Sequence, residues 1–516
     1  MDPLCKTNPA DLSLTKSWSQ VERRKVLSWL ILVLALCASV AWFEHSRIIS
    51  AGLIRGDANE YLAASYQGDL TLTGKRLFGY PLFLKVHREV CEWWAGIKDP
   101  FFWLLSAYVS QLLIYLACIY WLCQALRKVN VSVSSAILAL LILHPVLSSY
   151  AALPMSDVLM TADFSLMLAA LIMLLRSELR SPWYALALGL TIGIGLVLRP
   201  NFPVTAAATL FVIPLSGLLM ARRSHWPASL VIRRALISVT LALIGLAPLL
   251  GIALSKCTPA YGQVCLINPY IGHMGIRISV GFGLSAPRWT GAPKMDGVMN
   301  TVDPLFTRLF TTCSNKVTFS IQDAPIRWLF ACYMAAPMEL PGYTVKKVVA
   351  AFDNYSVNSM TYDVTTPTEA YINRGFSLVG FLGFAFALGI FLRALWKKDA
   401  VTFGYLTPPL VFVFAQINFH VENRYFMPVY PIFFIVGLVV LLNSVKSSWA
   451  QRLAVSGMTC FFSAFFLLQT YNWDLRDCEA FHGKTATVQN SERLRSTCPS
   501  SPRTSELVEK TQRFLP

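Results

Sequence analysis

The chain has 516 residues, of which 55% are hydrophobic and only 14% charged, and its mean hydropathy is +0.52. Soluble domains carry about 25% charged residues, so this composition excludes an ordinary soluble enzyme. It also excludes a disordered chain, because 13% of the residues are aromatic. Lysine and arginine outnumber aspartate and glutamate by 44 to 28, an excess typical of nucleic-acid-binding proteins or of the cytoplasmic loops of membrane proteins.

Apolar segments long enough to cross a bilayer recur along the chain. A helix needs about 17–25 predominantly apolar residues to cross the hydrocarbon core. The first segment follows a basic leader and lacks a small-x-small cleavage site, so it is interpreted as a retained span rather than a signal peptide. The sequence predicts an all-α polytopic membrane protein with about eleven transmembrane helices. They are residues 26–43, 101–126, 133–150, 158–175, 183–198, 202–220, 235–254, 375–392, 401–417, 425–442 and 453–468.

Basic residues define the sidedness of these spans. With the N-terminus in the cytoplasm, six inner segments hold 18 basic and five acidic residues, whereas the outer loop 44–100 holds seven of each. This bias supports the topology and removes the nucleic-acid interpretation. The predicted parts are a cytoplasmic leader (1–25), a first transmembrane block (26–254) that includes the outer loop 44–100, a large outer loop (255–374), a second transmembrane block (375–470) and an outer tail (471–516).

The positions of the ionisable residues and cysteines exclude some classes of function. Asp163 is the clear ionisable residue within the predicted spans, which argues against an ion-coupled transporter, because such proteins usually need several intramembrane charges. Six of the twelve cysteines fall in the large outer loop 255–374 and the outer tail 471–516, where an even number is compatible with disulfides. The expected pairs are Cys257–Cys265 and Cys478–Cys498. No spacing resembles a zinc site, so no metal ligand is predicted.

The first outer loop carries the richest polar pattern. Asp57 stands at the start of a helical pattern, Glu60 and Tyr61 follow, and Gly79-Tyr80-Pro81 comes downstream. The spacing of Asp57 and Glu60 is that of a capping box. A carboxylate at the membrane surface is also suited to deprotonating an acceptor hydroxyl. Both interpretations stay open, and one residue can serve both roles.

Three further polar groups lie at predicted outer ends of spans. Asp157 fits a cap of the helix that follows it. Arginine at the end of a span is usually an interface anchor, but the sidedness bias disfavours positive charge on this side. A phosphate-bearing lipid headgroup would explain Arg199 and Arg424 there, because a guanidinium binds phosphate in a bidentate manner. The remaining residues of these groups are His144, Glu422 and the belt aromatic Tyr425.

The order of these motifs resembles that of the GT-C superfamily, polytopic glycosyltransferases that use polyprenyl-phosphate sugars. The likeness is greatest to the bacterial branch related to protein O-mannosyltransferases and lipid A aminoarabinose transferases. It covers the order of elements over residues 20–440. The matching motifs are the first-loop Asp, a Tyr-Pro-Leu, a His-Pro…Ser-Asp hairpin, a Leu-Arg-Pro turn and a late Arg-Tyr-Phe-Met-Pro.

The resemblance implies that Asp57 lies at the catalytic centre of loop 44–100, with Glu60 as the adjacent alternative. The aminoarabinose-transferase branch has Lys-Pro-Pro where this chain has Gly79-Tyr80-Pro81. The lysine contact with the donor phosphate is therefore unassigned here, and Lys75, Arg76 and Lys85 are the nearby candidates.

The implied reaction transfers a sugar from a lipid phosphate to an envelope glycolipid, a polysaccharide or a secreted protein, on the periplasmic side of a bacterial inner membrane. A phosphate leaving group needs cations rather than an acid, so one base is enough, and we expect inversion at the anomeric carbon. No cofactor is required, and without an Asp-x-Asp motif no divalent metal is indicated. The alternatives are a lipid-linked glycan flippase or transporter and an O-antigen polymerase or ligase.

The outer loop 255–374 is too long for a simple connector. Residues 326–334 and 345–352 are typical of short amphipathic helices at a membrane interface. Tyr343, Lys346, Lys347 and Asp353 are candidates for an acceptor site, and a purely structural loop is equally compatible with the sequence.

Overall fold

The computed structural model describes the helical bundle and parts of its outer loops. The described residues are 22, 26–41, 43–44, 57–66, 77–144, 147, 150–199, 202–224, 227–261, 304–320, 324–353, 367–418, 423–445 and 447–482. Within them every regular element is helical, so the predicted all-α class is confirmed.

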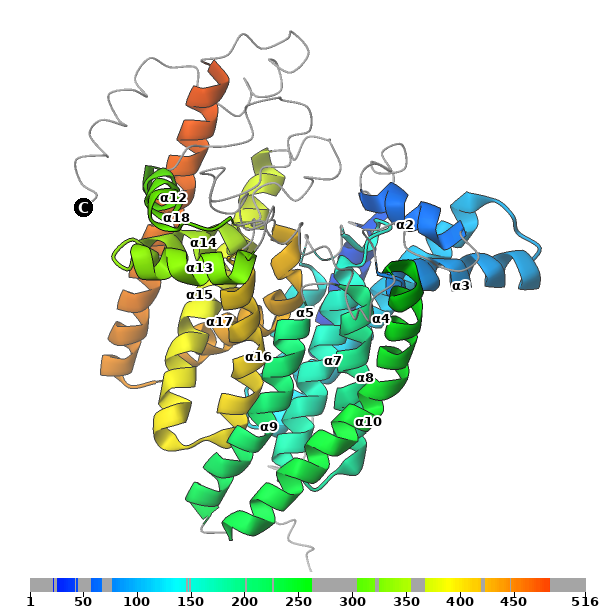
Figure 1. The fold of residues 1–516 in the computed structure, drawn as a ribbon, viewed down its shortest axis with the longest axis horizontal. Helices are drawn as coiled ribbons and strands as arrows, with labels where there is room; N and C mark the ends of the chain where they lie inside the picture. Colours follow the sequence, from blue (N-terminus) through cyan, green and yellow to red (C-terminus); the bar gives the residue numbers. More distant parts are fainter. Residues whose placement is uncertain are drawn as a thin grey trace, which may run out of the picture.

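Two groups of helices follow one another along the chain (Figure 1). After an apolar helix at Val26–Ala41, the first group is α2 (Asp57–Tyr66), α3 (Gly79–Trp94), α4 (Pro100–Lys128), α5 (Ser135–Ile142), α7 (Asp157–Arg176), α8 (Pro182–Leu198), α9 (Pro203–Ser224) and α10 (Ala228–Tyr261). The second group is α12 (Pro304–Lys316), α13 (Pro325–Ala335), α14 (Leu340–Phe352), α15 (Pro367–Lys397), α16 (Ala400–Gln416), the 3-10 helix η1 (Asn423–Val429), α17 (Tyr430–Ser444) and α18 (Trp449–His482).

Seven helices in the described part are long and apolar enough to cross a membrane, which makes the chain a multi-pass membrane protein. They correspond to α4, α7, α9, α10, α15, α18 and α17 with the end of η1 before it. Shorter apolar helices occupy three more predicted spans, at Val26–Ala41, Pro182–Leu198 and Ala400–Gln416. Ten of the eleven predicted spans therefore coincide with apolar helices.

The predicted span 133–150 is wrong as a single helix. The Ser134 hydroxyl caps the start of α5 by accepting a hydrogen bond from the Ile137 amide at 3.3 Å, but α5 ends at Ile142. Pro145 follows His144 in the sequence, and proline disfavours helical backbone in the residue before it. The prediction of a single helix rested on the apolar character of the segment, which does not reveal where a helix ends.

The α7 helix is the centre of the bundle. Buried positions make up 89% of its most apolar 18-residue window. Close backbone contacts between other pairs of spans occur at glycine: a Cβ at Gly189 of α8 would overlap the Ala242 carbonyl of α10, and one at Gly383 of α15 would overlap the Phe433 carbonyl of α17. Small residues allow this approach of membrane helices.

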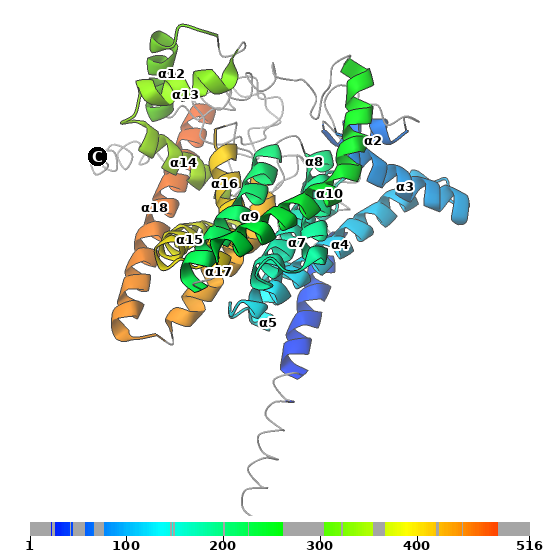
Figure 2. The same ribbon diagram turned by 60° about the horizontal axis from the view of Figure 1, so that its bottom comes forward.

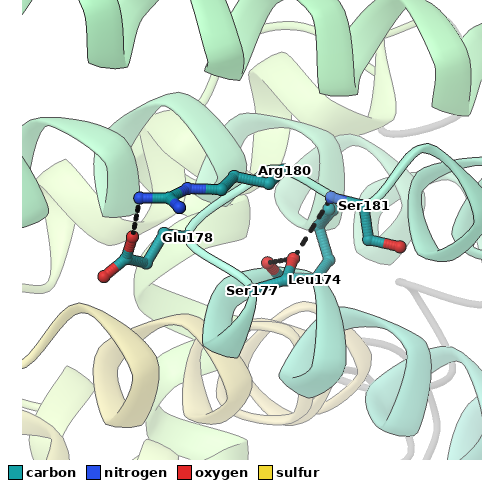
Figure 3. Close-up of polar contacts among 5 residues, drawn as sticks. All are labelled: Leu174, Ser177, Glu178, Arg180 and Ser181. Carbon is teal, nitrogen blue, oxygen red and sulfur yellow. Dashed lines mark hydrogen bonds and ion pairs between the residues drawn. The ribbon is translucent and has the colours of Figure 1, made fainter.

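A tight turn joins α7 to α8 at the end of the bundle opposite to α2 (Figure 1), and Figure 3 shows its polar contacts. The Ser181 amide donates to the Ser177 hydroxyl at 3.3 Å, and the Arg180 guanidinium pairs with the Glu178 carboxylate at 2.7 Å. Glu178 has a φ of 56°, which helps the chain reverse direction over few residues. The start of α7 and the end of α8 consequently lie at the same end of the bundle.

The helices α3, α12 and α13 lie outside the bundle, at the end where α7 begins and α8 ends (Figure 1). Figure 2 shows α3 on one side of the bundle and α12 and α13 on the other. A disulfide between Cys313 and Cys332 joins α12 to α13. The sequence did not single out this pair, and the side chains of Cys257, Cys265, Cys478 and Cys498 lie outside the described residues.

The two amphipathic segments of the large outer loop are helical, as predicted, but they differ in burial. The α13 helix exposes Ile326, Phe330 and Met334, as expected of an interfacial helix. The α14 helix instead buries residues 347–352 against the protein, so the interfacial prediction for 345–352 is wrong. Its apolar face packs on other helices rather than on lipid.

Candidate functional site

The α2 helix brings the predicted catalytic residues to one end of the bundle (Figure 1). It begins at Asp57, as the sequence pattern predicted, and Glu60 lies half-buried in its first turn. The Asp57 side chain lies outside the described residues, so its roles as cap and as base both stay predictions. Lys75, Arg76 and Glu422 also lie outside them, as does the side chain of Arg424 in η1.

Asp157 and Arg199 form a buried ion pair, with Oδ1 of the carboxylate against Nη2 of the guanidinium. Only 1% of Asp157 and 7% of Arg199 are exposed. The guanidinium carbon also lies 5.2 Å from the ring centroid of Tyr425, which provides a cation–π contact. Three elements, α7, the end of α8 and η1, therefore meet at Arg199.

The interpretation of Asp157 as a helix cap is not borne out. The helix α7 begins at Asp157 itself, and its N-cap, Ser156, makes no side-chain capping bond. The carboxylate faces Arg199 because a buried charge needs an opposite charge to offset its lost hydration. Its second oxygen, Oδ2, is buried and has no hydrogen-bond partner among the described residues.

Two tyrosines attach the outer helices to this ion pair. The Tyr61 hydroxyl of α2 shares a hydrogen bond of 3.0 Å with the hydroxyl of Ser156, the residue before Asp157. The fully buried Tyr80 of α3 packs edge-on against Tyr61, with ring centroids 5.0 Å apart. The helix that begins with Asp57 is thereby held beside the Asp157–Arg199 pair.

Gln111 of α4 is a residue that sequence reasoning missed. It accepts a hydrogen bond from the Tyr80 hydroxyl at 3.1 Å, and its own amide donates to the Leu153 carbonyl at 3.0 Å. Burial, and secondarily the nearby phenols and Asp157, raises the pKa of Tyr80, so its hydroxyl stays a neutral donor. The signal in the sequence was a glutamine in the middle of a predominantly apolar span.

Two basic residues of α3 differ in burial. Lys85, a predicted phosphate contact, pairs with Glu89 one turn later at 3.6 Å. Arg88 was not predicted, although its spacing from Tyr80 and Leu84 places it on the same buried face of α3. Its guanidinium carbon lies 4.4 Å from the Tyr66 ring centroid at the end of α2, so it ties α3 to α2.

His144 lies in an aromatic cluster formed with α15 and α17. Its ring lies 4.9 Å from that of Phe376, 6.0 Å from Tyr430 and 5.6 Å from Phe434, as measured between centroids. It is 2% exposed, so these rings enclose it rather than solvent. Asp353, Asn373 and Arg374 lie at the ends of α14 and α15 that border this cluster, and sequence reasoning missed the last two.

A comparison with protein-family models finds no match, and a comparison with curated proteins finds none either. Among solved structures, the chain is similar to the archaeal oligosaccharyltransferase AglB from Archaeoglobus fulgidus in complex with an inhibitory peptide and a dolichol-phosphate. The identity is 14% and the TM-score 0.39, over 95% of this chain and 60% of that one. The chain is also similar to a crystal structure of an Archaeoglobus fulgidus oligosaccharyltransferase in the apo form. There the identity is 12% and the TM-score 0.32, over 93% of this chain and 60% of that one. The chain thus spans about 60% of the length of these distant structural neighbours.

Proposed function

We propose that the chain is a membrane glycosyltransferase that moves a sugar from a polyprenyl-phosphate donor to an acceptor on the outer, periplasmic side of a bacterial inner membrane. The observation that carries this proposal is the attachment of α2, whose first residue is Asp57, to the buried Asp157–Arg199 pair at one end of an apolar bundle. The acceptor is an envelope glycolipid, a polysaccharide or a secreted protein.

The membrane bundle and Arg199 suit a donor that is anchored in the bilayer. An isoprenoid chain partitions into the hydrocarbon beside the spans and leaves its phosphate at the level of the helix ends. A guanidinium has five N–H donors, so Arg199 can bind a phosphate oxygen while it keeps its bond to Asp157. The Tyr425 ring lies against the same guanidinium.

The proposed reaction needs one base and a cationic leaving-group site. Asp57 takes the proton of the acceptor hydroxyl, whose oxygen attacks the anomeric carbon. The bond from that carbon to the phosphate oxygen breaks, and the phosphate keeps the electron pair. Arg199 and the other outer basic residues stabilise the departing phosphate, so no general acid is required. A single displacement inverts the anomeric configuration.

An Asp57→Asn substitution tests this role in the full-length chain reconstituted in nanodiscs. The donors are polyprenyl-phosphate mannose, glucose and aminoarabinose, and transfer to outer-membrane glycolipid and protein fractions is measured by mass spectrometry. We expect transfer from at least one donor, and a loss of about 100-fold or more in the variant, which is the usual size of a general-base contribution. Glu89→Gln, an exposed carboxylate on α3, is the matched control and should remain active.

Two outcomes would contradict the proposal. Full transfer by the Asp57→Asn variant would remove Asp57 as the base and favour an O-antigen polymerase or ligase. Transfer only from soluble UDP- or GDP-activated sugars would remove the lipid-phosphate donor.

A further inference from the structure

A second buried polar cluster lies where α14 ends and α15 begins. Asp353 follows the last residue of α14 and is 2% exposed. Its Oδ1 lies 3.6 Å from Nε of Arg374 in the second turn of the described part of α15. Taking two opposite charges out of water is tolerated only when further polar contacts offset their lost hydration. The ion pair makes this end of α14 and α15 a buried polar site.

Asn373, the neighbour of Arg374, has a buried amide whose hydrogen-bonding capacity is left unused by the described part of the chain. Its side chain is fully buried, and neither Nδ2 nor Oδ1 has a hydrogen-bond partner among the described residues. An amide has two N–H donors and two lone pairs, and buried amides in folded proteins are nearly always paired with protein, water or a bound molecule. A ligand or ordered water at this position would satisfy the amide.

Aromatic rings border the same cluster. Phe376 lies one helical turn after Asn373 on α15, and its ring stacks on Phe434 of α17 at 5.5 Å. The hydroxyl of Tyr430 donates to the carbonyl of Ala351, two residues before Asp353, at 2.8 Å. His144 contacts the rings of both Phe376 and Tyr430, and its Nδ1 is buried without a hydrogen-bond partner in the described part of the chain.

We propose that Asn373, Asp353 and Arg374 bind the hydroxyl groups of a neutral sugar ring. A sugar hydroxyl both donates and accepts, and this cluster offers amide and guanidinium donors together with carboxylate and amide acceptors. The charges of Asp353 and Arg374 cancel, which favours a neutral polyol over a phosphate. The bordering aromatic rings suit the apolar C–H face of a sugar.

The cluster complements the phosphate-binding role of Arg199. The helix η1 joins the two regions, because Tyr425 within it contacts Arg199 and Tyr430 directly follows it. The inference deepens the proposed function by giving the sugar its own subsite. Sugar binding to Asn373 does not require the Asp57 chemistry, so each of the two ideas can fail without the other.

An Asn373→Leu substitution tests the subsite, since leucine has a similar volume and no hydrogen-bonding groups. The full-length chain in nanodiscs is exposed to free mannose, glucose and galactose and, separately, to inorganic phosphate, and binding is followed by saturation-transfer NMR. We expect wild type to bind at least one sugar, and the variant to bind it at least tenfold more weakly. Thr407→Val is the control, because that hydroxyl donates to its own helix at the Phe403 carbonyl.

Transfer kinetics show which sugar occupies the subsite. In the variant, a raised KM for the lipid-linked donor would assign the subsite to the donor sugar, and a raised KM for the acceptor would assign it to an acceptor glycan. Asn373→Ser, which keeps one donor and acceptor, is used for the same measurements if the leucine variant does not fold.

Two results would overturn the subsite. Unchanged sugar binding together with a higher melting temperature in Asn373→Leu would mean that the amide is held by ordered water only. Binding of phosphate but of none of the three sugars would exclude a neutral ligand. Loss of transfer in Asp57→Asn with sugar binding retained would leave the subsite intact.

Discussion

The buried Asp157–Arg199 pair is the residue-scale feature on which the outer end of the bundle depends. Two desolvated charges balance each other there, and Tyr425 covers the guanidinium. Removing one partner leaves the other charge buried and uncompensated, which is more costly than replacing both. The stability of the bundle should therefore depend on Asp157 far more than on exposed carboxylates.

We expect Asp157→Ala to lower the free energy of unfolding by about 3–5 kcal/mol. The control is Glu178→Ala, which breaks the exposed pair with Arg180 in the opposite turn and should cost less than about 1 kcal/mol. Melting temperatures in one detergent compare the two variants, and the Asp157→Ala/Arg199→Met double variant should recover part of the loss. Equal melting of the two single variants would show that the inner pair is not desolvated.

Lys347 gives the protein a pH-dependent stability. Burial lowers its pKa from 10.5 to about 7, so between these values the unfolded chain binds a proton that the folded chain lacks. Stability should rise from pH 7 to pH 9, by up to about 1.4 kcal/mol per pH unit. Melting of wild type and Lys347→Met over this range measures the effect, and the slope should be smaller in the variant. Equal slopes would mean that the lysine keeps its charge in the fold.

At the scale of elements, contacts between helices depend on where glycine lies. Gly383 and Gly437 let α15 and α17 approach to backbone contact, whereas Gly389, later on α15, has open space where a Cβ would be. The sequence alone does not distinguish these three glycines, which all lie in apolar helices. Only the packing shows that Gly383 and Gly437 lie at a contact between helices and that Gly389 does not.

The Gly383→Ala substitution should therefore destabilise the bundle by about 1–3 kcal/mol, because the new methyl group overlaps the Phe433 carbonyl. Gly389→Ala is the matched control and should be neutral or stabilising by up to about 1 kcal/mol, since alanine favours helix. Melting temperature and the yield of monodisperse protein report both effects. A lower melting temperature in both variants would mean that the effect comes from helix flexibility rather than from packing.

At the scale of the molecule, the bundle has two different ends. The turn between α7 and α8 lies at one end, whereas α2, α3 and the Asp157–Arg199 pair lie at the other (Figure 1). The excess of basic residues in the predicted inner segments predicts that the first end faces the cytoplasm.

Cysteine labelling tests this assignment. In a background with the exposed Cys37 and Cys460 replaced by serine, Glu89→Cys should react with a membrane-impermeant maleimide in intact cells. Glu178→Cys should react only after the membrane is permeabilised, because it lies in the opposite turn. The reverse pattern would place the candidate site in the cytoplasm and contradict a periplasmic reaction.

Composition and charge pattern alone determined that the chain is an all-α, multi-pass membrane protein, and ten of its eleven predicted spans match apolar helices, because bilayer crossing depends on local apolar length. Only the tertiary structure showed which side chains contact one another across helices. The partner of Asp157 lies 42 residues away on another helix, the Cys313–Cys332 bond joins two helices, and the groups around Asn373 come from separate elements. Such contacts depend on how helices pack against one another, which local patterns in one sequence do not specify.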